Sequence, residues 1–119
     1  MSAAESEITP EFIEQQVARG REYVVSMFTL GPRERNDAAL LDELQIKHLQ
    51  HIFAARQAGI LVVNGPFLHG GNLRGLSIWN ASHEQVALHL QSDPMVQAGF
   101  LRFEIYPWFG IPGDTLPGA

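Results

Sequence analysis

The chain has 119 residues, of which 45% are hydrophobic and none is cysteine, and it carries a net charge of -5 at neutral pH. These values are typical of one globular domain, and they exclude disulfides, cysteine nucleophiles and cysteine metal sites. The eight lysines and arginines are scattered, which argues against nucleic acid as a partner. The sequence shows neither a secretory signal pattern nor an apolar run long enough to span a membrane, so we expect a cytoplasmic protein.

The first 20 residues are predicted to form a helical extension. Thr9 followed by Pro10 is typical of an N-cap and a first helical position, and Gly20 is expected to end the helix. A helix this short is not stable alone, so its apolar stripe should pack on the domain or on a partner. The stripe consists of Phe12, Ile13 and Val17.

A strong strand is predicted over residues 23–30, ended by Gly31-Pro32. Both of its alternating faces are apolar, so the strand needs cover on both sides. Helices can cover one face of a small sheet, and the other face then needs a second subunit. This pattern predicts a homodimer or a higher even oligomer.

The remaining elements predict a ferredoxin-like α+β fold, in the order β-α-β-β-α-β, with helices on one face of a four-stranded antiparallel sheet. We divide the chain into the extension (1–20), the domain (21–109) and an irregular tail (110–119). The expected elements are a helix over 38–58 capped by Asp37 and ended by Gly59, a strand over 60–64, a loop over 65–72, a strand over 73–80, a helix from Ser82 with a capping box to Gln85 that ends before Pro94, and a strand over 101–106 ended by Pro107.

Three groups of residues resemble the signature of the YCII-related (YciI-like) family, and together they span most of residues 22–109. They are His48-Leu49 with Ala58-Gly59-Ile60-Leu61 and Asn64-Gly65-Pro66; Ser82-x-Glu84 leading to Asp93-Pro94-x-Val96-x-Ala98-Gly99; and Glu104-Ile105-Tyr106-Pro107-Trp108. The resemblance implies a dimeric α+β barrel, as in muconolactone isomerases, with a pocket centred on a histidine and an aspartate, here His48 and Asp93. One characterised branch removes HCl from a chlorinated hydroxyhydroquinone in aromatic compound degradation. The leading helix and longer tail depart from the family pattern.

His48 and Asp93 each have a functional and a structural interpretation. His48 lies within the apolar stripe of the 38–58 helix, so it is either a general base that lines a cavity or a hydrogen-bonded core histidine. Asp93 either orients the imidazole or only caps a short turn with Pro94. The helix stripe that contains His48 consists of Leu40, Leu41, Leu44, Leu49, Ile52 and Phe53.

Other candidate residues lie near the predicted pocket. His51, one turn after His48, would need a third ligand such as His69 to hold a metal, so we predict surface histidines and no metal site. His83 and His89 are predicted to lie on a helix surface. Arg74 or Arg102 would anchor a carboxylate or phenolate, or would protect a strand edge. We expect the loop that begins with Gly65 and Pro66 to form the pocket rim. Phe67, Trp108 and Phe109 are expected to form either an aromatic wall for a flat ligand or part of the dimer interface.

The sequence therefore predicts a small lyase or isomerase that needs no cofactor. His48, supported by Asp93, would remove a proton from a small oxygenated compound, in line with the absence of cysteine and of nucleotide-binding motifs. The alternative is a non-catalytic dimeric module that binds a small ligand or assists another enzyme, with His48 as a structural residue.

Overall fold

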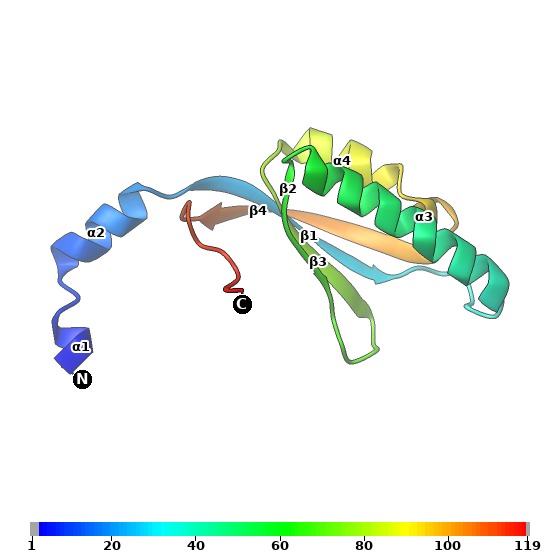
Figure 1. Ribbon diagram of the computed structural model, residues 1–119, viewed down its shortest axis with the longest axis horizontal. Helices are drawn as coiled ribbons and strands as arrows, with labels where there is room; N and C mark the ends of the chain where they lie inside the picture. Colours follow the sequence, from blue (N-terminus) through cyan, green and yellow to red (C-terminus); the bar gives the residue numbers. More distant parts are fainter. Residues whose placement is uncertain (1–2, 119) are drawn as a thin grey trace. The chain divides into compact units, whose positions relative to one another are not determined.

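The computed structural model describes residues 3–118 of the chain. These residues form two compact units, of which one is Tyr23–Trp108 and the other combines the segments on either side of it. None of the described helices is both long and apolar enough to cross a membrane. The elements in chain order are α1 (Ala3–Ser6), α2 (Pro10–Ala18), β1 (Arg21–Leu30), α3 (Ala38–Gln57), β2 (Leu61–Pro66), β3 (Leu73–Trp79), α4 (His83–Gln91), α5 (Pro94–Gln97) and β4 (Leu101–Gly110) (Figure 1).

The strands form one sheet in the order β2-β3-β1-β4. The pairs β1–β3 and β2–β3 are both antiparallel. Helices α3 and α4 lie on one face of this sheet, as Figure 1 shows. The predicted ferredoxin-like α+β fold is confirmed, because β1 and β3 are central neighbours and the β2–β3 hairpin forms one side of the sheet.

The core lies between the two helices and the sheet. Along β1, the buried side chains Val24, Ser26 and Phe28 alternate with half-buried ones, which is the period of a strand with one covered face. Trp79 of β3 is 1% exposed, and its indole Nε1 donates a hydrogen bond to Ser26 Oγ at 2.9 Å, so this buried polar group is satisfied. The remaining core residues come from the helices, from β2 and from the start of β4 with the residue before it; they are Ile52, Ala55, Leu61, Val86, Leu90, Met95, Phe100 and Leu101.

The opposite face of the sheet is apolar and only partly covered. On β1, Tyr23, Val25 and Met27 alternate with the core residues and are half-buried. The Trp108 ring of β4 lies 6.5 Å from the Tyr23 ring, centroid to centroid. Strand β1 is therefore apolar on both faces, as predicted, while α3 and α4 cover one of them.

Helix ends occur where the sequence predicts them. Asp37 caps α3 by accepting a hydrogen bond from Leu40 N at 3.0 Å. Ser82 and Gln85 form the predicted capping box, since each side chain bonds the other residue's backbone N–H, at 3.1 and 2.9 Å. Gly59 follows α3 with a φ of 79°, a conformation that favours glycine. The predicted start and end of α3 are confirmed.

Two predicted strand ends are wrong. Strand β2 extends to Pro66, because the chain keeps its pairing with β3 beyond residue 64. Strand β4 does not end at Pro107 but continues to Gly110. Strand β4 is an edge strand, so one of its two sides forms no backbone hydrogen bonds with another strand of the sheet. A proline, which lacks an N–H, is tolerated in such a strand.

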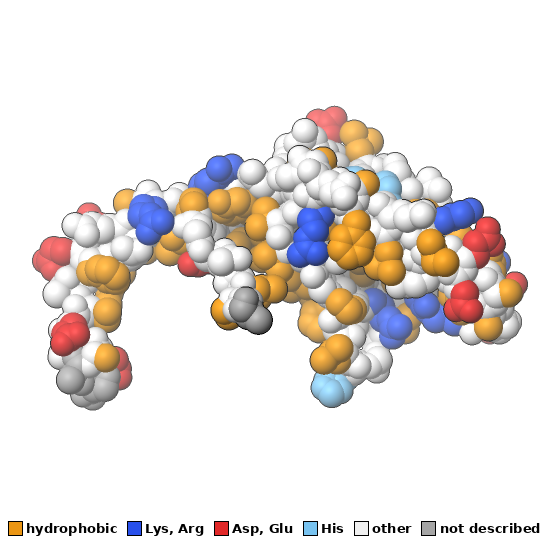
Figure 2. All heavy atoms as spheres, viewed as in Figure 1, with side chains coloured by type: hydrophobic (Ala, Val, Ile, Leu, Met, Phe, Trp, Pro, Cys, Tyr) orange, Lys and Arg blue, Asp and Glu red, His pale blue; other side chains and the backbone are white. Residues whose placement is uncertain are grey.

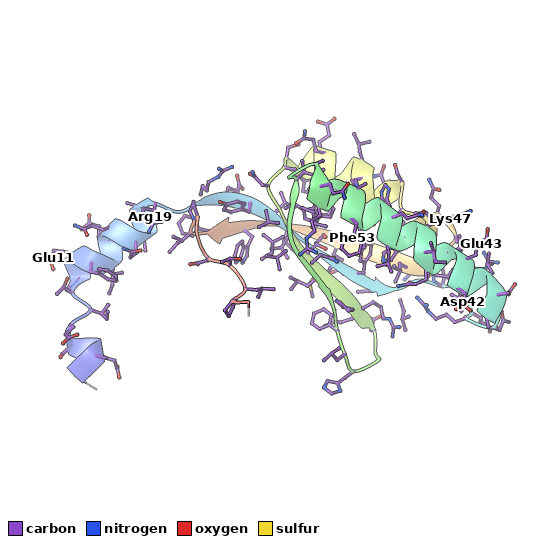
Figure 3. All side chains as sticks on the ribbon, in the orientation of Figure 1. Glu11, Arg19, Asp42, Glu43, Lys47 and Phe53 are labelled. Carbon is purple, nitrogen blue, oxygen red and sulfur yellow. The ribbon has the colours of Figure 1, made fainter. Side chains whose placement is uncertain are left out.

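The apolar stripe of α3 is narrower than predicted. Leu49 and Phe53 are 38% and 47% exposed, whereas His48 and Ile52 are buried. Successive helical residues differ by about 100° around the axis, so Leu49 and Phe53 lie to one side of the buried row. Phe53 is labelled in Figure 3, and Figure 2 shows apolar side chains exposed on the same face. The Arg56 guanidinium lies 5.8 Å from the Phe53 ring.

The second unit contains α2, which begins as predicted. Thr9 accepts a hydrogen bond from Phe12 N at 3.1 Å. Beyond the helix, the Phe109 ring occupies the space that a Cβ of Gly20 would take, so a larger residue there would require this ring to move. The side chains of the α2 stripe, Phe12, Ile13 and Val17, are about half exposed.

Candidate functional site

His48 is held on the inner side of α3, facing the sheet. Leu44 and Ile52, one turn before and one turn after it, lie on the same side of the helix and belong to or border the core. The imidazole meets the Phe28 ring edge to face at a centroid distance of 5.5 Å. The residue is 8% exposed, so its ring nitrogens need partners inside the protein or in a cavity.

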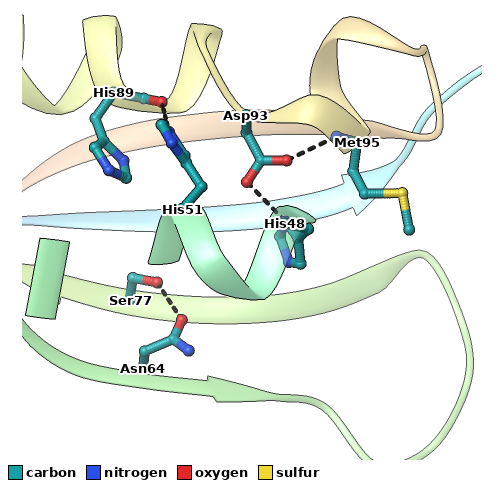
Figure 4. Close-up of polar contacts among 7 residues, drawn as sticks. All are labelled: His48, His51, Asn64, Ser77, His89, Asp93 and Met95. Atoms are coloured by element: carbon teal, nitrogen blue, oxygen red, sulfur yellow. Dashed lines mark hydrogen bonds and ion pairs between the residues drawn. The ribbon is translucent and has the colours of Figure 1, made fainter. Parts of the chain in front are cut away.

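Asp93 lies at the N-cap of α5 and is 1% exposed. Its Oδ1 accepts a hydrogen bond from Met95 N at 2.8 Å, which is the capping bond. Its Oδ2 lies 2.6 Å from His48 Nδ1 (Figure 4). The two interpretations of Asp93 are therefore compatible, because one carboxylate oxygen caps the helix and the other bonds the imidazole.

This contact determines which nitrogen of His48 carries the proton. A carboxylate only accepts, so Nδ1 donates, and the neutral ring keeps its lone pair on Nε2. No described residue forms a hydrogen bond with Nε2. Protonation of Nε2 would create an imidazolium directly beside the Asp93 carboxylate, which stabilises it. His48 is therefore arranged to accept a proton at Nε2.

A cavity of about 180 Å³ opens beside His48. For comparison, an apolar cavity of about 150 Å³ is large enough for benzene, so this one accommodates a single substituted ring. Asn64 contributes a polar group to its wall, since Ser77 Oγ donates to Asn64 Oδ1 at 2.8 Å and the amide nitrogen has no described partner. The cavity is lined by Phe28, Arg35, Gln45, His48, Leu49, Ile52, Asn64, Gly65, Pro66, Arg74, Gly75, Met95 and Leu101.

Only part of the predicted pocket rim lies at this cavity. Gly65 and Pro66 line it, whereas its lining does not include Phe67 or Trp108. Phe67 is 41% exposed and Trp108 lies against Tyr23, while Phe109 belongs to the second unit. Three polar residues that line the cavity were not among those predicted for the pocket, namely Arg35, Gln45 and Asn64. The one available signal was Asn64, a polar residue at the end of an apolar strand.

Of the two arginines considered from the sequence, Arg74 lines the cavity and Arg102 is exposed on β4. Arg35 joins Arg74 there, although it lies far away in sequence. Burial, and then the charge of Arg74, lower the pKa of Arg35 below its usual value. The cavity therefore has a positively charged side.

His51 and His89, which were predicted as surface histidines, are half-buried and contact each other. Their rings stack at a centroid distance of 3.8 Å, and His51 Nε2 donates to the His89 carbonyl oxygen at 2.6 Å (Figure 4). Trp79 lies 5.2 Å from the His89 ring, and His89 Nδ1 is buried with no hydrogen-bond partner among the described residues. Burial, and then His51, lower the pKa of His89. The contact between α3 and α4 brings these side chains together.

The residues that could bind a metal do not gather in one place. His69 is exposed in the loop between β2 and β3, away from the stacked pair of His51 and His89. Among residues 3–118, no group of three or more histidine, aspartate or glutamate side chains has the arrangement of a metal site.

No protein-family model and no curated protein sequence matches the chain. Among solved structures, the chain is similar to 5-chloro-2-hydroxyhydroquinone dehydrochlorinase (TftG) from Burkholderia phenoliruptrix AC1100, determined in complex with 2,5-dihydroxybenzoquinone. The two share 18% sequence identity with a TM-score of 0.54, over 71% of this chain and 92% of the dehydrochlorinase. At this identity the likeness supports the ferredoxin-like α+β fold.

Proposed function

We propose that the protein is a small lyase or isomerase that uses His48 as a general base and Asp93 as the residue that orients it. The observation that supports this best is the 2.6 Å contact between His48 Nδ1 and Asp93 Oδ2, while Nε2 has no partner within residues 3–118. In this arrangement the carboxylate fixes the tautomer, and the imidazole accepts a proton from a ligand in the cavity.

The proposed reaction begins with the transfer of one proton to His48. His48 Nε2 takes a proton from carbon or oxygen of the substrate, and the electrons of that bond form a new double bond. In an elimination the leaving group then departs with its own electron pair. In an isomerisation the proton returns at another carbon. Asp93 stabilises the imidazolium in both cases, and these steps do not call for a cofactor.

The similarity to the dehydrochlorinase favours elimination from an oxygenated ring compound. That protein is named for 5-chloro-2-hydroxyhydroquinone and was determined with 2,5-dihydroxybenzoquinone, and both compounds have a single six-membered ring. A cavity of about 180 Å³ suits a ligand of this size. We propose on this basis a distant relationship to the YCII-related family and a substrate in aromatic compound degradation.

The first experiment measures chloride release from 5-chloro-2-hydroxyhydroquinone by the wild-type protein and by His48→Ala. We expect the variant to lose a factor of about 10²–10⁴ in rate, the usual contribution of a general base. His83→Ala serves as the control, because His83 is an exposed histidine at the start of α4. Turnover in His48→Ala equal to the wild type would refute the proposal.

The alternative is a non-catalytic module that binds a small ligand. The near-complete burial of His48 and its ring contact with Phe28 favour a structural role for this residue. In that case His48→Ala would lower the melting temperature and leave ligand affinity unchanged. Isothermal titration of 2,5-dihydroxybenzoquinone with both proteins distinguishes the two functions.

We also propose that the protein is a homodimer in which the apolar sheet faces of two copies meet. On this face, the side chains of Tyr23, Val25 and Met27 are only half-buried in a single chain. Sheets that pack face to face bury such residues at a separation of about 10 Å. Sedimentation equilibrium at micromolar concentration should give twice the chain mass, and Val25→Glu should give the monomer. A monomeric wild type would contradict this arrangement.

A further inference from the structure

Two arginine side chains line the cavity beside the His48 ring. Arg35 comes from the loop between β1 and α3, and Arg74 lies near the start of β3. Although the two residues are far apart in sequence, the charge of Arg74 is close enough to act on the pKa of Arg35. The fold therefore brings two like charges to one side of a cavity that contains the proposed base.

The charge of these two guanidinium groups is not compensated by the protein. Neither forms an ion pair with a carboxylate in the part of the chain that the structure describes. Arg35 donates to Phe100 O at 3.1 Å, and Arg74 makes only a long contact of 3.5 Å with Gly71 O. None of the described lining residues is acidic, and nearby Asp93 already uses both of its oxygens. An anion in the cavity would relieve this repulsion.

Contact with Phe100 engages only part of the Arg35 guanidinium. The Arg35 guanidinium carbon lies 5.7 Å from the ring centroid, whereas Arg33 from the same loop lies closer, at 4.8 Å. Arg33 also donates to Ala98 O and does not line the cavity. Both arginines therefore contact this ring, but Arg35 bonds Phe100 through one nitrogen only, and its other nitrogens have no hydrogen bond with the described residues.

We infer that the cavity binds small organic anions, with a carboxylate or phenolate oxygen held by Arg35 and Arg74 and the remainder of the molecule directed toward His48. Guanidinium groups bind carboxylates through paired, charge-assisted hydrogen bonds, and the cavity volume restricts the ligand to about one ring. The inference rests on the proposed function at one point, which is that the bound anion is the substrate on which His48 acts.

The experiment compares benzoate with benzamide by isothermal titration, because the two molecules have the same shape and differ in charge. We expect the wild-type protein to bind benzoate at least about tenfold more tightly than benzamide, with an affinity that falls as salt is added. Arg35→Gln and Arg74→Gln should each weaken benzoate binding by about tenfold and leave benzamide unchanged. Arg33→Gln is the matched control and should change neither. Circular dichroism establishes that each variant is folded.

Three results would overturn the inference: equal affinity for the two probes, no detectable binding of benzoate, or unchanged benzoate affinity in both cavity variants. The wild-type comparison does not depend on any variant being folded. His48→Asn separates this inference from the proposed function, since it should abolish turnover and leave benzoate affinity within about twofold. Charge-selective binding without any effect of His48 on turnover would refute the catalytic role and retain the anion site.

Discussion

Replacing Asp93 by asparagine should reverse the tautomer of His48 while leaving the fold intact. The amide oxygen keeps the hydrogen bond to Met95 N, because a backbone N–H needs an acceptor there. The amide N–H₂ then faces His48 Nδ1, where the carboxylate oxygen was. Since this group donates, Nδ1 must accept, and the ring proton moves to Nε2. The nitrogen that faces the cavity thus loses its lone pair.

The strength of this effect follows from the contacts. Rotating the amide to avoid it would lose the capping bond, about 1 kcal/mol, and would leave two donors facing each other, about 1–3 kcal/mol more. The rotated arrangement is therefore populated at no more than about 3%. Asp93→Asn exchanges a charge-assisted hydrogen bond for a neutral one, which costs about 1 kcal/mol of stability. Asp93→Ala loses both the capping bond to Met95 and the bond to His48, which costs about 2–4 kcal/mol. We expect the rate to fall by about 10²–10⁴ in Asp93→Asn.

The assay is the ¹⁵N chemical shift of the two ring nitrogens of His48, measured above neutral pH and assigned by comparison with His48→Gln. Wild-type protein should show the proton on Nδ1 and Asp93→Asn should show it on Nε2. Asp37→Asn is the matched control, because Asp37 caps α3 in the same way without touching a histidine. If His48 kept its proton on Nδ1 in Asp93→Asn, or if that variant were as active as the wild type, the proposed role of Asp93 would be wrong.

Three further predictions concern the surrounding structure. Because burial and His51 lower the pKa of His89 in the folded state, the unfolded chain binds this proton more readily, and stability should be complete above about pH 6.5 and fall as the pH decreases below it. The urea midpoint should decrease as the pH is lowered from neutral to acid. This pH dependence should be weaker in His89→Phe and unchanged in His83→Phe. Ser26→Ala should cost about 1–3 kcal/mol in urea unfolding, because the buried indole loses its acceptor, and a cost near zero would contradict this. Gly31→Ala should reduce the free energy of unfolding by about 1–3 kcal/mol and so lower the melting temperature, since the new Cβ would lie 2.2 Å from a backbone oxygen.

The fold could be predicted because local signals agree with each other along the chain. The caps at Asp37 and Ser82 and the stop at Gly59 depend on neighbouring residues alone, and all three are where the sequence indicates. The end of β4 could not be predicted in this way. A proline normally breaks a strand, and only the position of β4 at the edge of the sheet makes Pro107 compatible with one.

The candidate site was predictable only where the helical period determines the direction of a side chain. The spacing from Leu44 to Ile52 indicates that His48 points inward, and it does. The partners that come from other elements carry no such signal. Arg35 reaches the cavity from a loop, and the stacking of His51 on His89 depends on how α3 and α4 pack, which no local pattern specifies.

The unpaired nitrogen of His48 is the feature that a purely structural role explains least. A histidine kept for packing alone needs no ring nitrogen that faces a cavity, whereas Nε2 is not among the buried unpartnered atoms of the described residues and is open to the cavity that His48 lines. Here Nδ1 has a buried carboxylate at 2.6 Å, and Nε2 has no described partner. Replacing the whole buried pair by apolar residues of similar volume is often stabilising, whereas a leucine at position 48 alone would leave the Asp93 carboxylate buried without its partner. Chemistry at Nε2 gives a reason for keeping the costlier pair beside a cavity.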